Sequence, residues 1–209
     1  MQNVLIDTSP ITQDALSYLR DKNTDIVKFR HFADKISQQL LVKALKESDY
    51  VATQIETPIG PTTTNFLHGN FIFVTILRAG LSMMPAALQL IPTMPVGFLG
   101  LKRDEQTAIA YEYYNNLPKI TQDSIVIVAD PMLATGGSMI KTLEKISSFS
   151  PKEMRIVTVI CAPEGIEKVH AQFSNIQIIT AAVDETLNDK KYIIPGLGDF
   201  GDRYFGTEG

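Results

Sequence analysis

Hydrophobic residues follow one pattern near the start of the chain and another after about residue 70. Between Asp25 and Ser48 they recur every three or four positions with polar residues between them, which is typical of an amphipathic helix. A shorter stretch from Thr12 to Arg20 has a modest apolar side, and Thr12 can cap a helix there. We expect these two helices to pack as a pair within an N-terminal helical segment, residues 1–48.

Short, continuous apolar runs alternate with helical segments in the remainder of the chain. The runs are residues 71–77, 96–99, 124–129, 155–160 and 176–181, and the helical segments are 81–90, 137–147 and 165–173. Apolar runs separated by helices are typical of strands that are buried on both faces of a parallel sheet. The pattern therefore predicts an α/β core over residues 50–182, in which helices flank a parallel β-sheet.

Two segments depart from this alternation. Residues 103–119 contain extended-type residues, among them Tyr111, Tyr113 and Tyr114, and predict a protruding β-hairpin whose aromatic content suits a dimer contact. Residues 183–209 are rich in glycine, charge and aromatic side chains, so we expect an ordered segment whose backbone can bend around a flat ligand. A length of 209 residues fits one domain that contains all these parts.

Charge and cysteine content limit the classes of ligand. Lys and Arg number 19 against 23 Asp and Glu, and the net charge of −4 provides no global basic field for nucleic acid or an anionic membrane. Any anionic ligand must therefore be captured locally. The single cysteine, Cys161, excludes an intramolecular disulfide and a multi-cysteine zinc site, and we expect a buried structural thiol. Without a targeting pattern or a membrane-length apolar run, the sequence favours a cytoplasmic protein.

The chemically most specific segment is residues 125–138. It combines an apolar strand, Asp130 at the carboxyl end of that strand, and a loop of small residues that opens a helix. Gly136 and Gly137 let backbone amides approach an oxyanion, the neighbouring threonine and serine add hydroxyl donors, and the helix N-terminus favours negative charge. Asp130 can accept hydrogen bonds from sugar hydroxyls. These groups predict a phosphorylated ribose as the ligand, and the simpler alternative is a turn with a helix cap.

Two common phosphate-binding motifs are absent from the sequence. The loop lacks the lysine of GxxxxGK[ST], and no GxGxxG opens the first strand–helix turn. A nucleoside-triphosphatase and a Rossmann dehydrogenase are therefore excluded.

Residues 130–138 resemble the phosphoribosyl diphosphate (PRPP) loop of type I phosphoribosyltransferases, and they are most similar to that of the uracil phosphoribosyltransferase family. The resemblance implies PRPP contacts from Asp130, Pro131, Met132, Leu133, Ala134, Thr135, Gly136, Gly137 and Ser138. Other type I members usually have two consecutive acids and another acid before the threonine, where this sequence has Pro131 and Ala134. We therefore assign no general base to this loop.

The resemblance covers about residues 50–209 and includes two arginines. Arg78 follows the first apolar run and Arg103 follows the second, so both lie beyond the carboxyl end of a strand, where open parallel sheets bind ligands. From the residues alone a surface ion pair is the favoured role of each. The resemblance instead assigns both to PRPP, where an arginine can stabilise the leaving diphosphate. Lys102 occupies a position at which many relatives have an aromatic residue.

The C-terminal segment resembles the uracil-binding segment of the same family, in which the backbone does most of the base recognition. Position by position, the resemblance assigns uracil contacts to Ile193, Gly198, Asp199 and Phe200, and it places Asp199 near PRPP as well. Phe200 departs from the small residue that we expect there. From the residues alone, an ordered C-terminal loop without a ligand is an equal alternative.

The resemblance implies a type I fold with a C-terminal hood over the base, and an enzyme of pyrimidine salvage that converts uracil and PRPP to UMP and diphosphate. Its catalytic residues would be Arg103, Asp130 and Asp199. It also implies Mg²⁺ carried mainly by PRPP, a homodimer or higher oligomer, and control by GTP in some relatives, at a site that we cannot place. The alternatives are a phosphoribosyltransferase for another base and a nucleotide-sensing RNA-binding regulator on the same fold.

Overall fold

The computed structural model of the protein describes residues 3–103 and 110–207. Its centre is a seven-stranded sheet in the order β1-β11-β9-β7-β4-β5-β6, in which all neighbours are parallel except β5 and β6. The strands are β1 (Val4–Ile6), β4 (Asn70–Leu77), β5 (Val96–Arg103), β6 (Ala110–Asn116), β7 (Ser124–Ala129), β9 (Glu153–Val157) and β11 (Gln177–Thr180). The parallel sheet that the five apolar runs predict is therefore confirmed.

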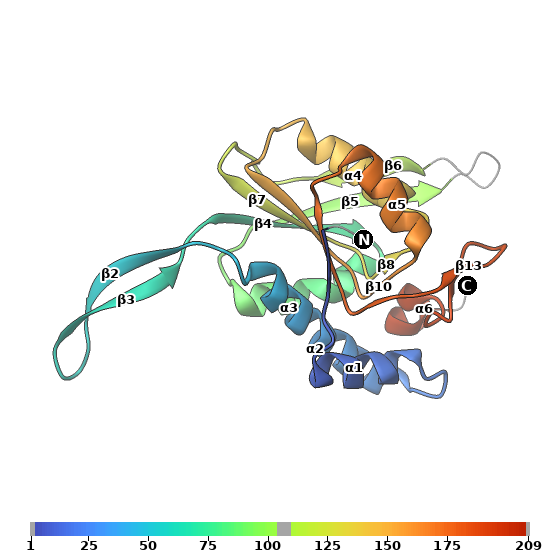
Figure 1. Cartoon of the computed structure of the whole chain (residues 1–209), viewed down its shortest axis with the longest axis horizontal. Coiled ribbons are helices and arrows are strands. Elements are labelled where there is room, and N and C mark those ends of the chain that lie inside the picture. The colour runs from blue at the N-terminus through green and yellow to red at the C-terminus, as the bar shows by residue number, and fades with distance from the viewer. Residues whose placement is uncertain (1–2, 104–109, 208–209) are drawn as a thin grey trace.

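Helices cover both faces of this sheet (Figure 1). On one side lie α1 (Pro10–Arg20), α2 (Ile26–Leu45), the 3-10 helix η1 (Ala79–Met83) and α3 (Met84–Leu90); on the other lie α4 (Gly137–Ser147) and α5 (Pro163–Gln172). The sheet side chains alternate between the two layers: Phe73 packs in the core under α2, whereas Val74 packs in the core under α4. Apolar burial on both faces explains why the strands appear as continuous apolar runs.

The N-terminal segment is not entirely helical. Val4–Ile6 forms the edge strand β1, which pairs with β11, and three residues are too few to produce a recognisable apolar pattern. The helix of Thr12–Arg20 begins earlier, at Pro10, so Thr12 is not its cap. Thr12 is instead buried, and its hydroxyl donates a hydrogen bond of 2.6 Å to Asp7 Oδ2.

The hairpin expected over residues 103–119 is present in part, as a strand that pairs antiparallel with β5, and a second hairpin leaves the body at a place that the sequence pattern did not indicate. Ala110–Asn116 forms β6, an edge strand of the central sheet, while the other part of the expected hairpin, residues 104–109, lies outside the described residues. The hairpin that leaves the body is formed by β2 (Tyr50–Glu56) and β3 (Pro61–Leu67) (Figure 1). Both of its faces are largely exposed, so burial imposes no apolar pattern on it.

The carboxyl edge of the sheet continues into a smaller one. After β7, β9 and β11 the chain forms β8 (Met132–Leu133), β10 (Ile160–Cys161) and β12 (Ala182–Val183), which pair in parallel. Cys161 is fully buried there, as expected, and burial raises the pKa of its thiol to about 12. Among the described residues, no helix has the length and apolarity that a membrane crossing requires.

The C-terminal segment folds over this edge. It contains the short hairpin β13 (Thr186–Leu187) and β14 (Ile193–Ile194), followed by a short helix, α6 (Phe200–Phe205), which the sequence pattern did not predict. Asp199 caps α6, since its Oδ1 accepts a hydrogen bond of 2.9 Å from the backbone N–H of Asp202. The helix is only six residues long, too short to show a helical period.

Candidate functional site

A cavity of about 800 Å³ lies at the carboxyl edge of the sheet, between the loop that follows β7 and the C-terminal segment. Its lining residues are Ala79, Asp130, Met132, Leu133, Ala134, Thr135, Gly136, Gly137, Ser138, Met139, Lys190, Lys191, Tyr192, Ile193, Gly198, Asp199, Phe200 and Gly201. The structure thus brings together the two segments that the sequence singled out, residues 125–138 and 183–209, which are far apart along the chain.

One wall of the cavity is the turn from β8 into α4. Gly136 stands immediately before the helix in a left-handed conformation, with φ of 75°, which glycine adopts without a steric penalty. The helix then begins at Gly137, so its unpaired N–H groups and the positive end of its dipole lie at the cavity wall. This wall is suited to an anion.

The first turn of α5 supports the same wall from behind. The N–H of Ala162 donates a hydrogen bond of 2.9 Å to the carbonyl of Leu133. Gly165 lies so close that a Cβ atom there would be 2.4 Å from the carbonyl oxygen of Ala134. The backbone of the loop is therefore fixed by a second helix that the motif does not include.

Asp130 lies at the floor of the cavity, directly after β7. Burial raises the pKa of its carboxyl group to about 7; the hydrogen bond from the backbone N–H of Met132 opposes this rise, and the negative charge of Asp199 adds to it. A hydrogen-bonding or positively charged ligand would relieve this unfavourable burial of charge. Asp130 thus has the electrostatic character of a ligand-binding group.

The β13–β14 hairpin forms the opposite wall and contributes residues that sequence reasoning missed. Lys190, Lys191 and Tyr192 line the cavity from its turn. Glu164 anchors this hairpin to α5, since its Oε1 accepts hydrogen bonds from the Thr186 hydroxyl and the Leu187 N–H, at 2.8 and 3.0 Å. The lysine pair was a visible signal in the sequence, but only the hairpin shows that it faces the phosphate-type loop.

Phe200 departs from the expected small residue without filling the cavity with its ring. Its side chain is 1% exposed, and its ring packs edge-on against Phe29 of α2 with centroids 5.1 Å apart. The aromatic ring therefore anchors α6 to the helical layer. Gly198 and Asp199, to which the resemblance assigns uracil contacts, also line the cavity.

Two predicted residues, Arg78 and Pro131, are not among the described residues that line the cavity. Arg78 is exposed and pairs with Asp202 of α6 at 3.1 Å. The carbonyl of Pro131 accepts hydrogen bonds from the backbone N–H groups of Val159 and Ile160, at the start of β10, so Pro131 takes part in the smaller sheet. The backbone of Arg103 ends β5, opposite Ala110 of β6, and its side chain lies outside the described part of the structure.

The donor set of the cavity suits a cation that arrives with a phosphorylated ligand. Among the described residues no group of three or more His, Cys, Asp or Glu side chains could enclose a metal ion. Asp130 and Asp199, however, both line the cavity, and Asp199 raises the pKa of Asp130. Mg²⁺ typically binds one or two carboxylates together with substrate phosphates and water, and these two residues fit that mode.

Comparison with known proteins gives consistent similarities over the whole chain. The family model described as uracil phosphoribosyltransferase matches residues 6–207. A uracil phosphoribosyltransferase from Legionella pneumophila (strain Lens) is 42% identical over 206 residues, which are 98% of this chain and 96% of that protein.

Solved structures agree with this similarity. A protein from Aquifex aeolicus is 39% identical and superposes with a TM-score of 0.93, covering 98% of this chain and 99% of the other. The adenine phosphoribosyltransferase of Trypanosoma brucei, solved with AMP, pyrophosphate and ribose-5-phosphate, has a TM-score of 0.59, with 91% of this chain and 88% of the other covered. At 12% identity this second likeness concerns the fold alone.

Proposed function

The chain belongs to the uracil phosphoribosyltransferase family, and we propose that its cavity binds uracil and PRPP and converts them to UMP and diphosphate. The observation that carries this proposal is the meeting of an anion-binding helix N-terminus with the C-terminal segment around one cavity. One wall suits the phosphorylated ribose, and the other offers backbone groups to a flat base.

The loop of residues 134–138 holds the 5′-phosphate. Its residues line the cavity and can offer backbone N–H groups and two hydroxyls to one anion, and the dipole of α4 favours negative charge at the same place. Asp130, at the floor, accepts hydrogen bonds from the ribose hydroxyls. Because its carboxyl is costly to keep charged in the free protein, sugar hydroxyls bound there stabilise its ionised form.

The diphosphate leaves toward the positively charged residues around the cavity. Lys190 and Lys191 line the cavity, and Arg78 lies next to Ala79, which also lines it. We assign the diphosphate to these groups and to Arg103. Mg²⁺, held by PRPP oxygens with Asp130 and Asp199 beside it, would supply further positive charge to the leaving group.

The reaction is a displacement at the anomeric carbon of the ribose. A bond forms from N1 of uracil to this carbon while the bond from the carbon to the diphosphate oxygen breaks, the bonding electrons leave with the diphosphate, and the N1 proton passes to water. Ile193, Gly198, Asp199 and Phe200 hold the base through their backbone so that N1 faces the anomeric carbon. No general base is assigned, so we attribute most of the rate enhancement to positioning and electrostatic stabilisation.

Several finer properties remain proposals that rest on the family. We propose a homodimer or higher oligomer, which the exposed apolar residues of the β2–β3 hairpin support, Ile59 at its turn being 98% exposed. Control by GTP, a cytoplasmic location and the absence of nucleic-acid binding also remain predictions.

The proposed activity is tested by following UMP formation from uracil and PRPP. We expect UMP and diphosphate in equal amounts when Mg²⁺ is present. A chelator that removes Mg²⁺ should lower the rate strongly, and adding Mg²⁺ again should restore the rate. Efficient turnover of a purine together with weak turnover of uracil would contradict the choice of base. Absence of product with any base, combined with salt-dependent RNA binding, would favour the regulatory alternative.

Replacing Asp199 tests the assignment of the C-terminal segment. The Asp199→Ala variant loses both a carboxylate at the cavity and the cap of α6, since the Asp199 side chain accepts from the Asp202 N–H. We expect kcat/KM for uracil to fall by about tenfold or more, the equivalent of one lost charged hydrogen bond. Wild-type kinetics in this variant would show that the Asp199 side chain takes no part in the site.

A further inference from the structure

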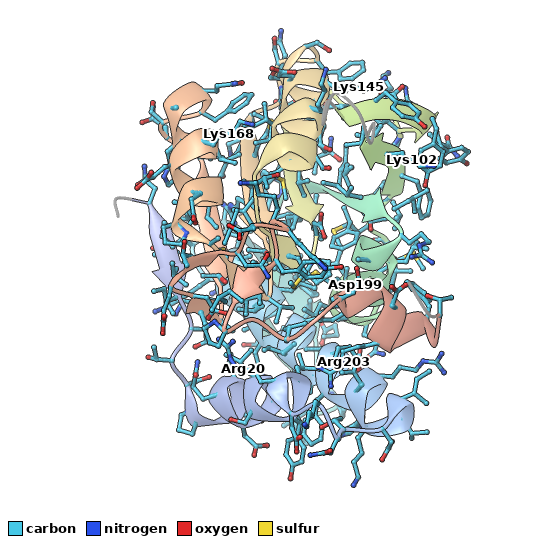
Figure 2. The ribbon with its side chains drawn as sticks, turned by 90° about the vertical axis from the view of Figure 1, so that its right-hand side faces the viewer. Arg20, Lys102, Lys145, Lys168, Asp199 and Arg203 are labelled. Carbon is cyan, nitrogen blue, oxygen red and sulfur yellow. The ribbon has the colours of Figure 1, made fainter. Side chains whose placement is uncertain are left out.

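The last turn of α1 touches the C-terminal segment at the point where it turns toward the cavity. Arg20 ends α1, and Figure 2 shows it with Arg203 between the N-terminal helices and the C-terminal segment. Neither arginine lines the cavity. Both nevertheless bind the backbone that leads to the cavity-lining residues.

Gly196 is held from both of its backbone groups. Its N–H donates a hydrogen bond of 2.9 Å to Asp184 Oδ2, and its carbonyl accepts one of 2.8 Å from Arg20 Nη1. Arg20 also donates to both carboxylate oxygens of Asp184, at 2.9 and 2.5 Å. With 4% of its side chain exposed, Asp184 makes a sheltered, two-pronged ion pair, which is a strong and directional interaction.

The next residue is held in a similar way. The carbonyl of Leu197 accepts a hydrogen bond of 2.7 Å from Arg203 Nη1. Arg203 also donates to the carbonyls of Leu19 and Asp21, on either side of Arg20, and its guanidinium lies 4.4 Å from the centre of the Phe29 ring. Two adjacent residues of the segment are therefore tied to the same helix end.

We infer that Arg20 and Asp184 are positioning residues for the base: they fix the backbone of residues 193–199 so that it reads uracil. This inference rests on the proposed assignment of that segment to uracil. Main-chain N–H and C=O groups cannot change position by a side-chain rotation. The position of the backbone therefore determines how uracil is oriented. A segment that must be ordered at each binding event would bind uracil more weakly.

The test compares Arg20→Lys with a matched control, Arg30→Lys. Lysine keeps the charge but carries its donors on a single nitrogen, so it cannot reproduce the planar fork in which Nη1 and Nη2 bind the two Asp184 oxygens and Nη1 also binds the Gly196 carbonyl. Arg30 also binds the C-terminal region, at the carbonyl of Tyr204, but beyond the uracil segment. We expect Arg20→Lys to raise KM for uracil about tenfold and Arg30→Lys to leave it within about twofold, with KM for PRPP unchanged in both.

A second variant, Asp184→Asn, keeps the size of the side chain and removes its charge, so it tests the pair from the other side. A purely structural role would lower the melting temperature of these variants and leave KM for uracil at the wild-type value, and that result overturns the inference. If the wild-type enzyme forms no UMP from uracil and PRPP, the assignment of the segment to uracil is wrong instead. An increase in KM for uracil in Arg20→Lys and Asp184→Asn, absent from Arg30→Lys, supports the inference.

Discussion

Asp130→Asn is expected to reduce kcat/KM for PRPP by about a hundredfold, which is the scale of losing one group that stabilises a transition state. Asparagine matches the shape of aspartate and removes its charge. The ribose hydroxyls then lose a charged acceptor, and the anomeric centre loses a negative charge beside it as it becomes positive. Steady-state kinetics with varied PRPP measure the effect, and unchanged kcat/KM would remove Asp130 from the site.

The same variant is expected to be more stable than the wild type at neutral pH. The pKa of Asp130 is about 7 in the folded protein, above its ordinary value of 3.8. At a pH between these two values, the carboxyl group is protonated in the folded state and ionised in the unfolded state. This group therefore destabilises the fold progressively as pH rises from about 4 to about 7. Asparagine removes that dependence.

Thermal unfolding without ligands measures this difference. The melting temperature of Asp130→Asn should exceed that of the wild type at pH 8, and the gap should shrink toward pH 4. Asp123→Asn is the matched control, because Asp123 is exposed and lies at the other end of β7. A gap that does not change with pH, or one of the same size for Asp123→Asn, would contradict the explanation.

The sequence predicted the strands of the core well, because a strand that is buried on both faces appears as a continuous run of apolar residues. The strand of residues 124–129 and the helix of 137–147 have the bounds expected for them. The elements that the sequence did not predict show no such pattern: β1 has three residues, α6 has six, and the β2–β3 hairpin is largely exposed on both faces. Their structure depends on contacts with distant parts of the chain.

The candidate site divides in the same way. The loop from Asp130 to Ser138 could be read locally, because a strand, a small-residue turn and a helix N-terminus adjoin in the sequence. Lys190 and Lys191 could not be placed, since their position depends on a hairpin that Glu164 of α5 anchors. Arg20 and Asp184 are 164 positions apart, so no local pattern indicates their ion pair.

Gly165 is another residue whose role no local pattern indicates, and its replacement is expected to impair PRPP binding strongly. A Cβ atom there would lie 2.4 Å from the Ala134 carbonyl oxygen and 2.9 Å from that of Leu133. Both contacts are with backbone, which cannot rotate away, so either α5 or the phosphate loop must shift. Overpacking of this kind costs about 1–3 kcal/mol. If about 1.4 kcal/mol of this cost distorts the loop in the bound state, the affinity for PRPP falls tenfold.

We therefore expect Gly165→Ala to raise KM for PRPP by about tenfold while KM for uracil stays near the wild-type value. Gly60→Ala is the matched control, because a Cβ atom at Gly60 has no atom within 4 Å. If the Gly165→Ala enzyme folds and has the wild-type KM for PRPP, α5 moves while the phosphate loop keeps its position, and α5 does not determine the conformation of the loop. An equal increase in both KM values would show that the displacement reaches the C-terminal wall, which α5 also anchors through Glu164.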